Sequence, residues 1–132
     1  MTSEAFRNNP LFLRNQFEGE GTFQIPIVKK QHISLEQLRF IGYDHIKSDE
    51  RENKDSVVHF FLDDYKFEVL WNHTEPRLEK LKQYKAVLTP QYSLYTEMPI
   101  TLQIYNTFRN RWVGAYLQSN GITVIPTMCW GE

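Results

Sequence analysis

Three short apolar segments separated by helical patterns constrain the fold of this chain more than any other feature. They are VVHFFL at 57–62, KAVLT at 85–89 and ITVIPT at 122–127. Each is rich in β-branched and aromatic residues, as buried strands are. A helix start at 74–76 and a long helical pattern over 98–121 lie between them. This order predicts an α/β fold with a β-α-β-α-β core at 57–132 and a small parallel or mixed sheet.

The residues before this core carry weaker patterns. Residues 1–22 mix Asn, Gly and acids with isolated aromatics, which predicts an irregular arm. The segment 23–56 then contains three expected features. FQIPIVKK alternates like a short edge strand interrupted by proline. SLEQ at 34–37 has capping-box spacing, which predicts a helix ending near Gly42, and a solvated polar loop is expected at 44–56.

Composition narrows the class of protein. The 132 residues are 41% hydrophobic and 14% aromatic, which is typical of one folded domain. A net charge of -1 gives no global attraction to nucleic acid or to a membrane, so nucleic-acid binding would need a local patch. The single cysteine, Cys129, cannot form an intramolecular disulfide, and no signal-like or membrane-spanning apolar run is present. We therefore expect a cytoplasmic location, in a bacterium or an infected host cell.

The fold class indicates where a site should lie. In parallel α/β folds ligands bind beyond the carboxyl ends of the strands, where loops and helix N-termini converge. That rule selects the segments DDY at 63–65, PQYSLY at 90–95 and MCWGE at 128–132. The binding residues predicted in them are Tyr65, Gln91, Tyr92, Tyr95 and Trp130.

Asp63, Asp64 and Ser93 are the catalytic candidates. Adjacent carboxylates on an extended segment point in opposite directions, so one is expected to face outward while the other caps the following helix. A metal site would need a further ligand, for which Glu132 is the candidate beside Asp63 and Asp64. Ser93 lacks the glycines of a nucleophile elbow, which favours a hydrogen bond to a neighbouring loop.

Arg109 and Arg111 on the long helical pattern are the candidates for holding an anion. Their guanidinium groups suit a phosphate or an acidic partner, and the alternative is an ordinary solvated helix face. His59 lies within an apolar strand, where a hydrogen-bonded core histidine is favoured over a catalytic one. No glycine-rich phosphate loop is present.

The motifs DDY, LTPxxSLYxxMP, an RNR helix and IPTxxW occur in this order between about Val57 and Glu132. In these motifs and their order, the chain resembles a family of proteins with a domain of unknown function, which bacteria, archaea, phages and mobile elements carry. The matching positions are Asp63, Asp64, Ser93, Tyr95, Pro99, Arg109, Arg111, Pro126 and Trp130. The resemblance implies an acid where this chain has Gln91 and a longer domain, so the chain looks like a shortened member. It implies no activity.

These observations favour a binding protein over an enzyme. We expect a phage or mobile-element accessory protein that binds a macromolecular partner, as an antagonist of a host defence or nucleic-acid-processing complex. A protein partner is expected, and no cofactor. A sheet that stops at its third core strand leaves an open edge and an uncovered apolar face, which the arm, a foreign protein or a homodimer would cover.

The alternative is an enzyme or enzyme remnant that acts on a nucleotide, a nucleic acid or another phosphate-bearing substrate. Asp63 or Asp64 would then be the base or the ligand of a divalent metal ion, and Arg109 or Arg111 would hold the phosphate.

Overall fold

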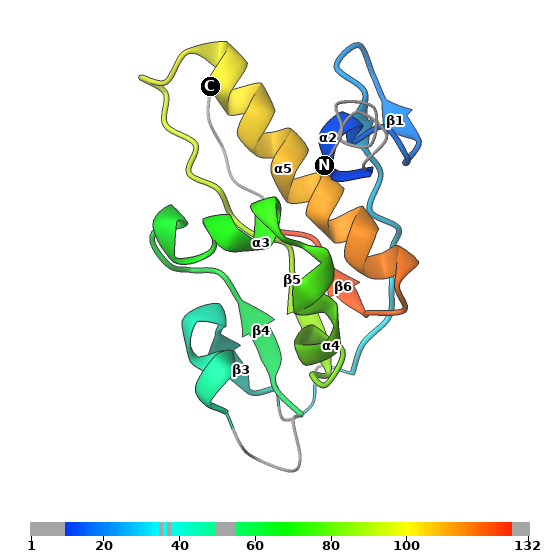
Figure 1. The fold of residues 1–132 in the computed structure, drawn as a ribbon, viewed down its shortest axis with the longest axis vertical. Coiled ribbons are helices and arrows are strands. Elements are labelled where there is room, and N and C mark those ends of the chain that lie inside the picture. The colour runs from blue at the N-terminus through cyan, green and yellow to red at the C-terminus, as the bar shows by residue number, and fades with distance from the viewer. Residues whose placement is uncertain (1–9, 35, 37, 50–54, 128–132) are drawn as a thin grey trace, which may run out of the picture.

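A parallel sheet of four strands forms the centre of the protein (Figure 1). The computed structural model describes residues 10–34, 36, 38–49 and 55–127. The strands, in sheet order, are β3 (Phe40–Gly42), β4 (Val57–His59), β5 (Ala86–Leu88) and β6 (Val124–Ile125). Val57 lies opposite Ala86, and Val87 lies opposite Val124. The predicted α/β class and the three parallel core strands are therefore confirmed, with β3 as an additional strand.

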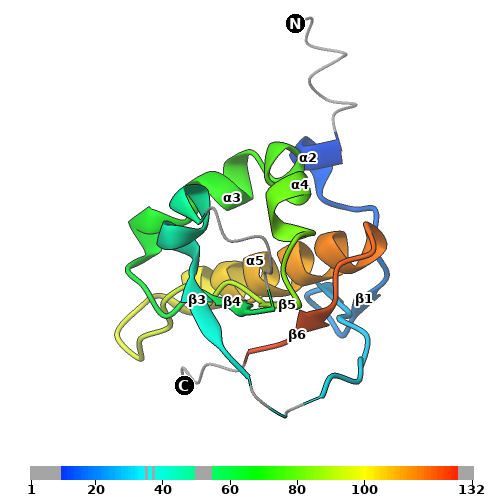
Figure 2. The same ribbon diagram turned by 90° about the horizontal axis from the view of Figure 1, so that it is seen from below.

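The helices of the core pack on one face of this sheet. The chain passes from β4 to β5 through α3 (Glu68–Asn72), the 3₁₀ helix η3 (Glu75–Arg77) and α4 (Leu78–Leu81), and from β5 to β6 through α5 (Ile100–Ser119). Parallel crossovers share one hand, and the strands are adjacent in chain order, so successive crossovers fall on the same side. Figure 2 shows α3, α4 and α5 on that side.

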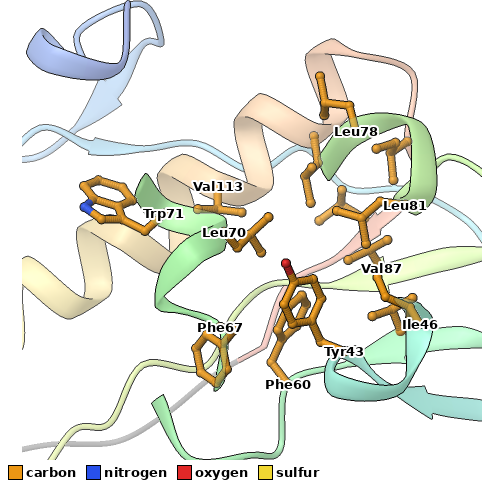
Figure 3. Packing of buried hydrophobic residues seen from close by; sticks show 14 of the residues in the cluster. Tyr43, Ile46, Phe60, Phe67, Leu70, Trp71, Leu78, Leu81, Val87 and Val113 are labelled. Atoms are coloured by element: carbon orange, nitrogen blue, oxygen red, sulfur yellow. The ribbon is translucent and has the colours of Figure 1, made fainter. Parts of the chain in front are cut away.

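The main core lies between the sheet and these helices. Val58, Val87 and Val124 are the buried strand residues that belong to it. Figure 3 shows part of the same cluster, in which Leu70 of α3, Leu81 of α4 and Val113 of α5 converge. Adding a Cβ at Gly114 would place it 2.7 Å from Thr89 Cγ2, so glycine is needed where α5 approaches the end of β5. The long helix predicted over 98–121 is confirmed.

The opposite face of the sheet is covered by the protein's own chain. Val57, Ala86 and Leu88 form a second buried cluster, against which Ile33 and Leu38 pack. These two residues belong to the extended connection between β2 and β3, which passes beneath the sheet in Figure 2. The face that was expected to need a cover is thus packed by the segment that precedes β3.

The N-terminal arm packs against α5 and, through Arg14, against α3. It contains α2 (Pro10–Leu13) and an antiparallel pair, β1 (Gly19–Glu20) with β2 (Ile25–Pro26). Arg14 joins it to the core, because its guanidinium carbon lies 3.6 Å from the ring centroid of Trp71 and 4.2 Å from that of Trp112. Burial lowers the pKa of Arg14 to about 10. The arm is therefore an attached part of the fold.

The predicted helix from Ser34 to Gly42 is wrong. Leu35 and Gln37 lie outside the described residues, and Phe40–Gly42 is strand β3, parallel to β4. The first residues of the expected polar loop instead form the 3₁₀ helix η1 (Tyr43–Ser48), and residues 50–54 are not described. Pairing with β4 gives Phe40, Ile41 and Gly42 main-chain partners that the capping-box spacing cannot reveal.

In the described part of the chain, no helix is both long and apolar enough to cross a membrane.

Candidate functional site

Two of the three predicted site segments meet at the carboxyl ends of β4 and β5. They line an open cleft of about 580 Å³. Asp63 and Lys66 reach it from the segment after β4, and Gln91, Ser93 and Tyr95 reach it from the segment after β5. The third segment, which includes Cys129, Trp130 and Glu132, lies outside the described residues.

Asp64 joins the two segments. Its carboxylate accepts a hydrogen bond from the Ser93 main-chain N–H at 3.0 Å and another from the Ser93 hydroxyl at 2.9 Å. Charge-assisted bonds of this kind fix the distance between two loops. The expected hydrogen bond of Ser93 to a neighbouring loop is therefore present, and the Ser93 hydroxyl is occupied by a structural contact.

Asp63 is exposed and lines the cleft. It precedes the 3₁₀ helix η2 (Asp64–Lys66), but its side chain makes no capping hydrogen bond. The expected division of roles between the two acids is thus half right. Asp63 faces outward, whereas Asp64 binds Ser93 in place of capping a helix. Asp63 is the carboxylate that remains available in the cleft.

Buried amide side chains on α5 hold the segment after β5. Asn110 donates to the Pro90 carbonyl at 2.6 Å, Asn106 to the Ser93 carbonyl at 2.7 Å, and Gln103 to the Met98 carbonyl at 2.9 Å. Buried carbonyl groups of an irregular segment need such donors. This role was not predicted from the sequence, although the three amides recur at helical spacing on one face of α5.

Arg109 is buried in the same network. Its guanidinium donates to both Glu68 carboxylate oxygens, at 2.9 and 2.8 Å, and to the Asn106 side-chain oxygen at 2.7 Å. It also lies 3.8 Å from the ring centroid of Tyr92. The alternative of a solvated helix face is wrong for Arg109, which is 6% exposed. That Arg109 holds an anion stays a prediction. Its hydrogen bonds join α5 to α3.

Tyr92 was predicted to bind a ligand and instead lies in the core, with 2% of its surface exposed. Its ring packs against Phe67 at a centroid distance of 5.2 Å. Burial raises the pKa of Tyr92 far above its ordinary value, against the opposing effect of Arg109. A side chain this buried can support the site from below but cannot meet a partner directly.

Arg111 and Gln91 line a second, smaller cavity of about 80 Å³. Burial lowers the pKa of Arg111. Within the described residues, no carboxylate lies at ion-pair distance from its guanidinium. Asn110 also lines this cavity, and its buried side-chain oxygen has no hydrogen-bond partner in the described part. Polar side chains contribute to the wall of this cavity beside Tyr92 and Leu94, and it has room for ordered water.

Exposed aromatic side chains are found at the larger cleft. Phe61 and Tyr95 line it, and Tyr65 lies in η2 between the lining residues Asp63 and Lys66. Phe61, Tyr65 and Tyr95 are 62%, 74% and 60% exposed, and we refer to them as the aromatic edge. Tyr65 and Tyr95 were predicted as binding residues, whereas Phe61 was missed. Phe61 is exposed because side chains alternate between the two faces of the extended segment that follows β4, and its neighbour Phe60 is buried. His59 supports this turn, since its Nδ1 accepts a hydrogen bond from the Phe61 N–H at 3.3 Å.

The described residues contain no group of three or more His, Cys, Asp or Glu side chains that could hold a metal ion. The metal ligand set predicted from the sequence included Glu132, which lies outside the described part, so that prediction stays open.

Comparisons with known proteins identify the family of the chain. The Gene 1 protein of Mycobacterium phage L5 is 42% identical over 120 residues, which cover 91% of this chain and 52% of that protein. The Gene 1 protein of Mycobacterium phage D29 is 49% identical over 74 residues, which cover 56% of this chain and 27% of that protein. The chain thus spans about half the length of the first relative and about a quarter of the second.

No solved structure matches the chain. The family model described as Domain of unknown function (DUF4417) matches residues 17–132. The resemblance noted from the motifs is confirmed, and it extends to residue 17 in place of starting near residue 57. The chain belongs to the DUF4417 family, and its relatives include phage proteins.

Proposed function

We propose that this chain is a phage accessory protein that binds a macromolecular partner through the aromatic edge. The observation that carries the proposal is the exposure of Phe61, Tyr65 and Tyr95 beside an open cleft. Aromatic side chains supply a large contact area at low entropic cost and are enriched at the centres of protein interfaces. A monomer gains no stability from exposing them together.

The candidate catalytic groups Asp64 and Ser93, and the candidate anion-binding group Arg109, already bond to other residues of the chain. This supports a binding protein over an enzyme. Asp64 and Ser93 bond to each other, and Arg109 bonds to Glu68. The Asp64–Ser93 hydrogen bonds hold the two cleft segments together, and a preorganised surface loses less entropy when a partner binds. The kinship with phage proteins supports a protein partner from the host. The partner that we propose is a host defence or nucleic-acid-processing complex, which this protein would antagonise.

A capture experiment tests this proposal. Tagged protein would be incubated with a Mycobacterium lysate, a source suggested by the phage relatives, and compared with a variant carrying Phe61→Ser, Tyr65→Ser and Tyr95→Ser. We expect the variant to retain its fold, because all three side chains are exposed, and to lose the partner by roughly tenfold or more, as removal of interface aromatics does.

The matched control is Phe23→Ser. Phe23 is 61% exposed and lies between β1 and β2, away from the cleft at the carboxyl ends of β4 and β5. This control should capture the partner as well as the unchanged protein does. Equal capture by the triple variant, or equal loss in the control, would remove the proposal.

An enzyme acting on a phosphate-bearing substrate is the second candidate, favoured by one observation. Asp63 lines the cleft beside Lys66, and its carboxylate accepts no hydrogen bond from the described residues. Asp63→Asn separates the two candidates because it removes the charge without touching the Asp64 contacts. If partner capture persists while the biological effect of the protein disappears, the enzyme is favoured. If both persist, binding by the aromatic edge is favoured.

A further inference from the structure

A further cavity lies between η1 and the η3–α4 segment, apart from the cleft at the ends of β4 and β5 and from the small cavity lined by Arg111. Its volume is about 420 Å³, which falls in the range of small-molecule sites. Three cationic side chains, Lys47, Arg77 and Lys80, line it. They come from η1, η3 and α4, which the fold brings together, so the cluster is a product of tertiary structure.

Arg77 is the central group of this cavity. Its Nε is buried and has no hydrogen-bond acceptor among the described residues. No carboxylate of the described part lies within ion-pair distance of its guanidinium, although Glu75 and Glu79 are near in sequence. The two terminal nitrogens of the guanidinium are not among the buried atoms and make no hydrogen bond to a described residue, so they are the donors that an anion in the cavity would meet. Arg77 is therefore placed to bind an acceptor that the described chain does not supply.

The remaining charges leave the cavity positive. Lys80 Nζ donates to the main-chain carbonyl of Asp49 at 3.1 Å, a neutral acceptor, and Lys47 makes no ion pair with a described residue. Asp44 is the single acid among the described lining residues, and Lys66 already engages it at 3.4 Å. Three cations and one carboxylate, which is already paired with Lys66, therefore line the cavity, and this balance favours an anion.

The rest of the wall is apolar. Ile46, Val69 and Pro76 line the cavity together with the ring of Tyr43. In Figure 3, Tyr43 and Ile46 of η1 lie beside the packed residues of the core, with the Tyr43 hydroxyl directed away from Phe60. Burial raises the pKa of Tyr43, and the nearby charge of Arg77 opposes that rise, so the phenol stays neutral. The wall suits the uncharged part of an organic ligand.

We propose that this cavity binds a small organic phosphate, with its phosphate group on Arg77, Lys47 and Lys80 and its apolar or planar part against Tyr43 and Val69. A phosphate monoester carries about two negative charges and three strong acceptor oxygens, which match this set of donors. The site is separate from the aromatic edge, so it stands or falls independently of the proposed function.

Titration of the full chain followed by amide NMR shifts tests the site. The probes are adenosine 5′-monophosphate and phenyl phosphate, with adenosine and inorganic phosphate as controls. We expect both organic phosphates to shift amides of residues 43–48 and 75–81 more than those of 60–66. Adenosine should not bind, and inorganic phosphate should bind more weakly than either probe.

Two variants locate the interaction. Arg77→Gln should weaken binding of the probes by roughly tenfold or more, because it removes a charge-assisted contact. Lys47→Gln changes an exposed residue that the fold does not need, and it should weaken binding by a smaller factor. The control is Lys82→Gln, which alters an exposed lysine already paired with Glu79 at 3.6 Å and outside the cavity.

The proposal is overturned if neither organic phosphate binds at millimolar concentration, or if binding is unchanged in both Arg77→Gln and Lys47→Gln. Adenosine that binds as tightly as its monophosphate would show that the cations are not used. Inorganic phosphate that binds as tightly as the organic probes would contradict the role of the apolar wall.

Discussion

Replacing Trp112 by alanine is expected to lower the free energy of unfolding by about 4 kcal/mol, the usual cost of truncating a buried tryptophan. Trp112 is 0% exposed. Its ring stacks on Tyr116 at a centroid distance of 5.0 Å and meets the edge of Trp71 at 5.5 Å. The substitution removes this contact area and leaves a cavity between α3 and α5.

The same substitution should release the N-terminal arm, because Trp112 carries three of its contacts. Arg14 lies over the ring, Phe17 packs against it at 5.9 Å, and the indole N–H donates to the Gln16 side chain at 3.1 Å. Urea denaturation measures the loss of stability, and hydrogen exchange of residues 10–27 measures release of the arm.

Two further variants calibrate the Trp112 result. Trp112→Phe keeps most of the volume and should cost less than about 1.5 kcal/mol. Phe23→Ala, at a position that is 61% exposed, should change stability by less than about 0.5 kcal/mol. A Trp112→Ala cost as small as that of Phe23→Ala would contradict the described packing of the arm.

Replacing Arg109 by methionine is expected to lower the free energy of unfolding by about 3 kcal/mol, as breaking a buried ion pair does. The Arg109 side chain is 8% exposed, and Glu68 is 39% exposed. The substitution keeps most of the apolar stem but leaves Glu68 and the Asn106 oxygen without their donor. Because Asn106 also holds the Ser93 carbonyl, the cleft segment after β5 should loosen.

A double-mutant cycle with Glu68→Gln isolates the pair from these other contacts. Glu68→Gln alone should lower the free energy of unfolding by about 1 to 2 kcal/mol, since a neutral acceptor remains. In the double variant, the loss should be smaller than the sum of the losses in the two single variants. Arg111→Met is the matched control on the same helix, because no described carboxylate pairs with it. If Arg109→Met proves as mild as a typical surface substitution, the buried network is wrong.

The parallel core of the fold could be predicted because its signals are local. The apolar runs around Val57, Ala86 and Val124 became neighbouring strands, and the long helical pattern became α5. Strand β3 could not be predicted, because Ser34 and Gln37 imitate a helix start while the partner of Phe40 lies in β4. Non-local pairing of this kind leaves no mark in a short sequence window.

The candidate site was predicted only in part for a related reason. Ile100 and Tyr105 belong to the apolar spacing of α5, yet both are exposed, while Gln103 and Asn106 are buried. The irregular segment after β5 presents carbonyl groups toward α5, and only polar side chains can satisfy them. Hydrophobic periodicity treats a polar residue as exposed, so it assigns such a helix face to the wrong side.

Hydrogen exchange of the full chain with and without its captured partner tests the central claim most directly. If the aromatic edge is the binding surface, amides of residues 60–66 and 91–99 should exchange more slowly in the complex. Amides of residues 19–27, around the matched control Phe23, should be unchanged. Protection confined to residues 19–27, or to any surface other than the ends of β4 and β5, would contradict the account.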